Sequence, residues 1–272
     1  ERVEIMLRKP AVANHFYQGS SDGLREQVGR YVSTDIERIK AIGVLAPHAG
    51  LVYSGAVAGA VYSKVTLPEI FILIGPNHTG VGAPVSVFSE GEWDMPNGRV
   101  KVDAELARAI AGQSRYASED YTAHTGEHSL EVQIPFIQYF SRDFKIVPVT
   151  MMSTAIEVCR EVGIAISHAI KETQKDVLIV ASSDMTHYES GKSAKEKDQK
   201  AIEKILALDP AGLHKTVKEY GITMCGFAPA VTMLYAALEL GATKATLVKY
   251  MNSGDVSGDY DQVVGYAGMI IS

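Results

Sequence analysis

Two histidines follow two short apolar stretches of the sequence, and each lies in a turn rich in Gly and Pro. His48 comes shortly after Ala41–Ala46, and His78 comes shortly after Ile70–Ile74. Imidazole is the commonest metal ligand in proteins, so two histidines at neighbouring strand ends can converge on one ion. Each could instead be a loop histidine bonded to the backbone, but the matching placement of the two favours a shared site.

A third apolar stretch, Val177–Ala181, is followed by Asp184 and His187. A carboxylate can orient an imidazole that acts as a general acid or base. The alternative is that Asp184 forms a turn or caps a helix and that His187 is exposed. Three strand ends that each deliver a histidine favour the chemical interpretation.

Cys225 lies just before the apolar helical stretch Phe227–Leu240. A thiol at a helix N-terminus has a lowered pKa, which suits a nucleophile or a metal ligand. The alternative is a buried structural cysteine, the usual state of a lone cysteine. For Cys159, in the middle of a predicted helix, only the structural interpretation is favoured.

The run from His124 to His128 matches the H-x-x-E-H pattern of inverted zinc proteases. That mechanism needs both histidines on one helix face, and Gly126 makes a helix here unfavourable. Ser129 is expected to cap the next helix. The two histidines are therefore predicted in the loop before it, where His128 can enter a cleft as a substrate-binding or acid group.

Short Val- and Ile-rich stretches alternate with longer amphipathic ones, which predicts a largely parallel or mixed sheet between helices. Strands are expected over Ala41–Ala46, Ile70–Ile74, Val85–Phe88, Lys145–Thr150, Val177–Ala181, Ala245–Met251 and Val263–Ile271. Helices are expected over Gly55–Lys64, Ala104–Gln113, Ser129–Phe140, Ala155–Thr173, Ser193–Leu208, Ala211–Glu219 and Phe227–Leu240. The predicted fold is an α/β three-layer α/β/α sandwich, with residues 75–102 as a hairpin excursion from the sheet. In open α/β sheets the site lies beyond the carboxyl ends of the strands.

Length and composition narrow the function classes further. The 272 residues are predicted to form one domain, 1–272. A net charge of −6 argues against a nucleic-acid partner, and two cysteines are too few for a disulfide framework. The apolar runs are too short to span a membrane, and Glu1–Pro10 lacks the continuous apolar core of a signal peptide, so a cytoplasmic protein is expected. There is no Walker A, Rossmann or G-x-S-x-G motif.

Taken together, these residues resemble the Memo family in blocks that run in order from residue 8 to residue 256. The blocks are Arg8-Lys9-Pro10-Ala11-Val12-Ala13 with Phe16-Tyr17, Pro47-His48-Ala49-Gly50 with Tyr53-Ser54-Gly55, Gly75-Pro76-Asn77-His78, Glu127-His128-Ser129-Leu130-Glu131, Ser182-Ser183-Asp184 with His187, Cys225-Gly226, and Ser253-Gly254-Asp255-Val256. Asn14, Gln18 and Leu51 depart from the family's pattern without touching the metal positions.

The resemblance implies a fold similar to class III extradiol dioxygenases of the protocatechuate 4,5-dioxygenase type. It implies His48, His78 and Cys225 as metal ligands, Asp184 and His187 as an acid–base pair, and His128 as a further histidine of the cleft. Those dioxygenases hold Fe(II) with two histidines and a carboxylate. The thiolate of Cys225 is softer, so copper or zinc also suits the set.

The resemblance leads to three functional hypotheses. The first is an Fe(II) oxygenase that cleaves catechol-type substrates with O₂, with Tyr53, Trp93 and Phe227 as cleft walls. The second is a non-catalytic protein that binds iron or copper, or docks a peptide in the same cleft, in redox or metal handling. The third is zinc-dependent hydrolysis. The resemblance also implies a radical SAM partner protein, and oligomers are common for such folds.

Overall fold

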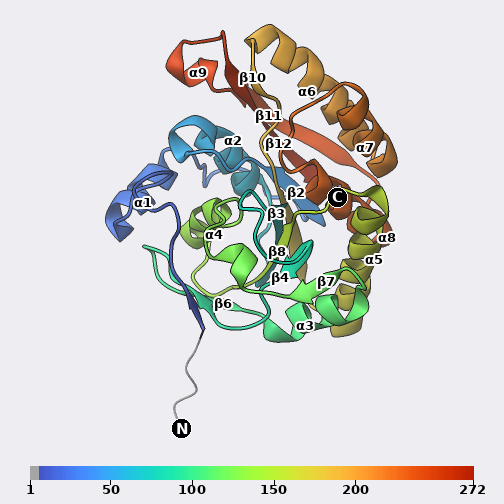
Figure 1. Cartoon of the computed structure of the whole chain (residues 1–272). Coiled ribbons are helices and arrows are strands. Elements are labelled where there is room, and N and C mark those ends of the chain that lie inside the picture. Colours follow the sequence, from blue (N-terminus) through green and yellow to red (C-terminus); the bar gives the residue numbers. More distant parts are fainter. Residues whose placement is uncertain (1–5) are drawn as a thin grey trace.

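The computed structural model describes residues 6–272 (Figure 1). Residues 1–5, which begin the Glu1–Pro10 stretch and the predicted domain 1–272, lie outside the described residues. Among residues 6–272, no helix is both long enough and apolar enough to cross a membrane.

A twelve-stranded mixed sheet forms the middle of the molecule. Its centre is a run of parallel neighbours in the order β6 (Val100–Val102), β8 (Lys145–Met151), β3 (Ile70–Pro76), β9 (Val177–Ser182) and β2 (Gly43–Ala46). β3 is buried along its whole length, because helices cover both faces of the parallel part. Burial on both faces also explains the unbroken apolar run Ile70–Ile74 that predicted this strand.

Antiparallel strands extend the sheet on both sides of this centre. On one side β12 (Val263–Ile271) pairs with β2, and β11 (Ala245–Asn252) and β10 (His187–Glu189) pair with β12. On the other side lie four short strands, β5 (Glu92–Trp93), β1 (Leu7–Arg8), β4 (Val85–Val87) and β7 (Ala117–Glu119). β4 pairs with β8 antiparallel, and the β5–β6 hairpin joins β8 through β6. The predicted excursion over residues 75–102 is therefore wrong, since its strands belong to the main sheet.

Helices cover the sheet in two layers (Figure 1). One layer holds α1 (Ser21–Gly29), α2 (Leu51–Lys64) and α4 (Ile134–Phe140), which pack against one another. The other holds α3 (Ala104–Gln113), α5 (Ile156–Thr173), α7 (Pro210–Glu219) and α8 (Phe227–Glu239), with α6 (Gly191–Leu206) beside α7 and the short α9 (Gly254–Ser257) after β11. The predicted three-layer α/β/α sandwich with a mixed sheet is confirmed.

One predicted helix, Ser129–Phe140, differs in its first part. A short 3₁₀ helix covers Glu131–Gln133, and α4 begins at Ile134. Ser129 does not cap a helix, because its hydroxyl donates to the carbonyl oxygen of Pro76 at 3.0 Å. The hydroxyl ties this loop to the end of β3 instead. Helix α1 was not predicted from the sequence. Of the strands that are two or three residues long, only β4 was predicted.

Asp103 joins the start of α3 to two lysines from other elements. Its buried carboxylate accepts from the amide of Leu106 at 3.0 Å, from Lys175 Nζ at 2.7 Å and from Lys145 Nζ at 3.3 Å. Burial alone raises the pKa of Asp103, but the Lys175 hydrogen bond and the Leu106 amide outweigh it and leave the pKa lowered. The charged carboxylate therefore stabilises the fold at neutral pH.

Replacing Asp103 with Ala should lower the free energy of unfolding by about 1–3 kcal/mol at pH 7, through loss of a helix cap and of charge-assisted bonds. Since a lowered pKa gives stability that is present above the unfolded-state pKa, the deficit should shrink as pH falls below about 4. Chemical denaturation at several pH values measures this. Glu105→Gln is the matched control, because Glu105 also contacts Lys175 at 2.7 Å but is largely exposed. If the loss of unfolding free energy in D103A does not change with pH, the charge of Asp103 does not stabilise the fold.

Candidate metal centre

Three neighbouring parallel strands deliver three side chains to one edge of the sheet. β9 lies between β3 and β2, and Ala46 at the end of β2 is in register with Ser182 at the end of β9. His48, His78 and Asp184 each stand two residues beyond the end of their strand. The sheet geometry therefore brings together residues that are far apart in the sequence, as the strand-end rule predicts.

Cys225 reaches the same place from the loop between α7 and α8. The next residue, Gly226, lies against the end of β9: a Cβ atom there would stand 2.2 Å from the carbonyl oxygen of Ser182. The Gly226 amide also donates to the Ser183 hydroxyl at 2.9 Å. Only glycine permits this close approach, which places the thiol beside the strand ends.

The donor atoms of His48, His78 and Cys225 all lie within 4.8 Å of one another. Sγ of Cys225 is 3.3 Å from Nε2 of His48. His48 is buried, Cys225 is half-buried, and the His78 side chain is 35% exposed. The structure thus brings together the three residues that the resemblance implied as ligands.

The hydrogen bonds around His48 fix which of its nitrogens is free. Ser182 Oγ donates to the carbonyl oxygen of Ser129 at 2.6 Å and accepts from Gln133 Nε2 at 2.7 Å. Its only proton is used, so His48 Nδ1, at 3.0 Å, must be the donor to this hydroxyl. The Nε2 lone pair of His48 then faces Cys225 and is free for a metal. Burial and the neighbouring His128 hold the pKa of His48 well below its usual range, which keeps the ring neutral.

The amide orientation of Gln133 supports this assignment. Its Nε2 contacts the carbonyl oxygens of Ala46 at 3.3 Å and Pro47 at 3.0 Å, which can only accept. Its Oε1 accepts from the hydroxyl of Tyr62 at 2.9 Å. The amide therefore presents a donor, not an acceptor, to Ser182.

Glu127 fixes His78 in the same way. Its Oε1 accepts from His78 Nδ1 at 2.9 Å and from the amides of His128 and Ser129 at 2.9 and 2.8 Å, while Oε2 accepts from the His78 amide at 2.5 Å. Burial alone raises the pKa of Glu127, but the hydrogen bond from His78 and the amides outweigh it and lower the pKa to about 2. A permanent carboxylate thus holds the Nδ1 proton, and His78 presents Nε2 to the site.

Asp184 does not orient His187. The carboxylate oxygen Oδ1 of Asp184 accepts from the amides of His48 at 2.8 Å and Ala49 at 3.3 Å, and burial raises its pKa. His187 Nδ1 lies 2.9 Å from the carbonyl oxygen of Thr223, which can only accept. Among the described residues, no hydrogen bond joins Asp184 to His187. Asp184 and His187 do lie together, with a carboxylate oxygen and a ring nitrogen within 4.8 Å of each other, but the predicted orientation of the ring by the carboxylate is not formed. Thr223 orients His187 instead, and Asp184 shapes the loop of His48.

The predicted lowering of the Cys225 pKa is also wrong. Burial and the nearby carboxylate of Asp184 raise the pKa of this thiol above its ordinary value and outweigh the hydrogen bonds from the amides of Asp184 and Gly226, which lower it. The Asp184 amide, 3.3 Å from Sγ, does not offset them. A thiolate at this position requires a cation, which a bound metal supplies.

All six predicted site residues line one cleft of about 460 Å³: His48, His78, His128, Asp184, His187 and Cys225. Its apolar lining comes from Phe16, Tyr188 and Val264. The predicted walls are wrong. Tyr53 is exposed on α2, Trp93 is buried with the Arg8 guanidinium 4.2 Å above it, and Phe227 packs against His214.

His128 lies in the cleft between His78 and Phe16. Its ring stacks on that of His78 with centroids 4.7 Å apart, and the ring of Phe16 meets it edge-on at 4.8 Å. His124, the other histidine of the H-x-x-E-H pattern, is buried away from the cleft with Nε2 3.2 Å from the carbonyl oxygen of Ser86. The zinc-protease arrangement is not formed.

A buried carboxylate anchors the N-terminal segment beside the cleft. Glu131 accepts from Arg8 and Tyr17 and from the amides of Ala11 at 2.8 Å and Val12 at 3.1 Å. Arg8 also donates to the carbonyl oxygens of His124 at 3.0 Å and Glu127 at 2.5 Å. The segment that carries Phe16 is thereby fixed to the loop that carries His128.

The donor set suits a transition metal. Two neutral imidazoles and a thiolate bind zinc, copper or iron, and they leave coordination positions that face the cleft. The carboxylate oxygens of Glu127 are used by N–H donors, so this residue acts through His78. Sequence reasoning did not assign Ser182, Gln133, Glu127 or Thr223 a role, although Glu127 and Ser182 stand in the resemblance blocks.

Comparison with known proteins gives a consistent result. A family model described as Memo-like protein matches residues 8–270. A MEMO1 family protein of Pyrobaculum aerophilum is 42% identical, with 98% of this chain and 99% of the relative covered. One of Aquifex aeolicus is 44% identical at the same coverage. The crystal structure of an uncharacterized protein from Escherichia coli K12 has a TM-score of 0.56 at 13% identity, covers 85% of this chain and all of its own, and shares the fold.

Replacing Glu127 with Gln should weaken metal binding about 10–100-fold, because the amide cannot hold the Nδ1 proton of His78 as a carboxylate does. Competition with a chelator measures the affinity, and thermal unfolding shows whether the variant folds. Glu119→Gln, at an exposed carboxylate outside the cleft, is the control. An unchanged affinity in E127Q shows that Glu127 does not set the ligand geometry of His78.

Proposed function

Because the chain belongs to the Memo family, we propose that it is a metal-dependent oxygenase that binds Fe(II) and opens catechol-type rings with O₂. His48, His78 and Cys225 hold the ion in this proposal. The observation that carries it is the arrangement of the cleft: the donor atoms of the three candidate ligands lie within 4.8 Å of one another, and His128 and His187 line the same space. A structural metal site is closed by a fourth protein ligand, whereas a catalytic site keeps an open position.

The size and lining of the cleft fit a small aromatic diol. A volume of about 460 Å³ lies within the range of small-molecule sites. Phe16 and Val264 offer apolar contact to a ring, and the histidines offer polar contact to its hydroxyl groups. When bound, Fe(II) supplies a Lewis acid for the two substrate oxygens and the electrons that activate O₂.

His187 has the geometry of a proton carrier. Its Nδ1–H is committed to the carbonyl oxygen of Thr223, so Nε2 accepts the proton of a substrate hydroxyl and later returns it to a product oxygen. His128 binds the second hydroxyl from the side of Phe16. In the overall reaction one ring C–C bond breaks and both oxygen atoms of O₂ enter the product, so no further reductant is needed.

One observation favours a second function, metal handling without turnover. Cys225 stands where a carboxylate would suit Fe(II) best, and its softer thiolate favours copper or zinc. In this alternative the cleft stores or transfers a metal and His187 has no catalytic part. Metal identity and oxygen consumption distinguish the two functions.

The first test is the metal content of protein purified without oxygen. We expect stoichiometric iron in the native protein and its loss in Cys225→Ala and His48→Ala, which remove a ligand. His168→Ala, at an exposed histidine on α5, should keep the metal. Stoichiometric copper or zinc in place of iron supports metal handling and contradicts the oxygenase.

The second test is oxygen uptake by the Fe(II)-loaded protein with a panel of catechols. Replacing His187 with Ala should leave the metal content unchanged and lower turnover about 10²–10⁴-fold, the usual contribution of a general acid–base group. The native protein should form a yellow ring-opened product. Absence of uptake with every catechol, or full turnover in H187A, counts against the mechanism.

A further inference from the structure

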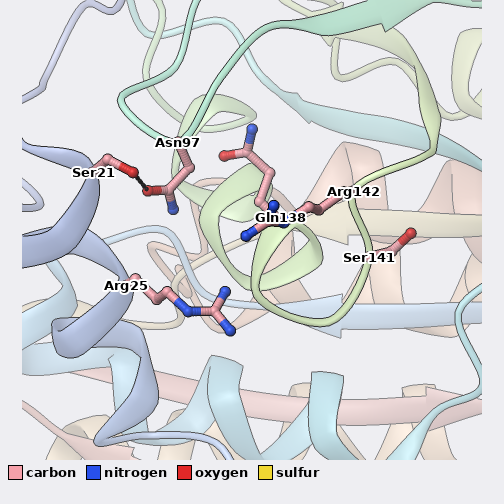
Figure 2. Close-up of a pocket in the computed structure, with 6 residues that line it drawn as sticks. All are labelled: Ser21, Arg25, Asn97, Gln138, Ser141 and Arg142. Atoms are coloured by element: carbon pink, nitrogen blue, oxygen red, sulfur yellow. Dashed lines mark hydrogen bonds between the residues drawn. The ribbon is translucent and has the colours of Figure 1, made fainter.

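A second pocket lies away from the metal centre, between α1, the turn at Asn97 and the end of α4 (Figure 2). Its volume is about 270 Å³, and its lining is polar throughout: Ser21, Arg25, Asn97, Gln138, Ser141 and Arg142. None of these residues lines the cleft of the metal centre. We call it the arginine pocket.

The two arginines of this pocket have no acidic partner. Among residues 6–272, neither Arg25 nor Arg142 forms an ion pair, whereas the exposed Arg30 and Arg108 both do. The Arg25 guanidinium lies 4.9 Å above the ring of Tyr139, a contact with its face that leaves its N–H groups free. Figure 2 shows both guanidinium groups directed into the space between α1 and α4. A pair of free guanidinium groups is suited to a phosphate or carboxylate.

Gln138 gives the second, independent indication of a ligand. The residue is only 9% exposed, and its Nε2 donates to the carbonyl oxygen of Gly98 at 2.9 Å. That bond fixes the amide orientation, since a carbonyl can only accept. Oε1 is then buried with no hydrogen-bond partner among the described residues. An unsatisfied buried acceptor is costly, and Gln138 lines the pocket, so a ligand whose hydroxyl reaches Oε1 when the atoms that cover it shift is favoured here.

The remaining lining groups add donors for an anion. Ser21 is the first residue of α1, whose N-terminus carries a partial positive charge. The Ser21 hydroxyl donates to Asn97 Oδ1 at 3.1 Å, so the Asn97 amide nitrogen is free to donate into the pocket (Figure 2). Two guanidinium groups carry two positive charges, which match the charge of about −1.5 to −2 on a phosphate monoester better than the single charge of a carboxylate.

We propose that the arginine pocket binds a small phosphate monoester that carries a free hydroxyl group. Arg25, Arg142 and Asn97 hold the phosphate, and Gln138 Oε1 accepts from the hydroxyl. The volume of about 270 Å³ is below the usual range for drug-sized ligands and fits a small monoester better than a nucleotide. The proposal does not depend on the chemistry of the metal centre.

Calorimetric titration of the full chain with glycerol 3-phosphate, glycerate, inorganic phosphate and glycerol tests this. We expect glycerol 3-phosphate to bind more tightly than inorganic phosphate, and glycerol not to bind. Arg142→Ala should weaken glycerol 3-phosphate at least about tenfold, through loss of charge-assisted hydrogen bonds. Gln138→Met, similar in size but without the acceptor, should reduce glycerol 3-phosphate to the affinity of inorganic phosphate.

Arg38→Ala is the control, because Arg38 is exposed like Arg142 but does not line the pocket. It should leave binding unchanged. Thermal unfolding checks that each variant folds. Because Arg142 is exposed, R142A tests the anion site even if the variant at the buried Gln138 does not fold. No binding of glycerol 3-phosphate, or equal binding in R142A, overturns the proposal. Equal affinity for glycerate overturns the choice of phosphate over carboxylate.

Discussion

The carboxylate of Glu127 accepts hydrogen bonds from the ring and amide of His78 and from the amides of His128 and Ser129. Through these four bonds one buried charge joins the end of β3 to the loop before α4. It sets the tautomer of His78 and the position of His128 together. Burying the charge of Glu127 is costly, but backbone and imidazole N–H groups directed at the carboxylate offset this cost. The charge is therefore compensated without a paired cation.

Around this carboxylate the site is built as a set of buried polar contacts with few alternatives. Glu131, four residues further along the chain, is a second buried carboxylate that accepts from several donors, among them Arg8 and Tyr17. It thereby fixes the N-terminal segment that carries Phe16. On the other side, Ser182 and Gln133 fix His48. Both histidines keep the proton on Nδ1 and donate it in a hydrogen bond, His48 to Ser182 and His78 to Glu127. Each therefore presents Nε2 to Cys225 and the cleft. Rigidity of this kind prepares a metal site before the ion arrives.

The sequence predicts which residues form the site better than it predicts their hydrogen-bond partners. His48, His78 and Asp184 are predictable because each follows a strand whose apolar pattern is clear, and parallel strands end at one edge. The partnership of Glu127 with His78 depends on how a loop 49 residues away packs, which no local pattern encodes. The Cys225 pKa was predicted wrongly because the helix N-terminus is a local feature, whereas burial and Asp184 are tertiary ones. Strands such as β1 and β5 are too short to show any periodicity.

The candidate ligands are distant in the chain, with His48 and Cys225 separated by 177 positions. Contacts of such separation form late in folding, because the loop they close is long. An ion cannot therefore act as a folding nucleus, as it does where all ligands lie within one short segment. An ion bound here would be taken up by a chain whose sheet is already assembled, and its loss would leave the fold in place.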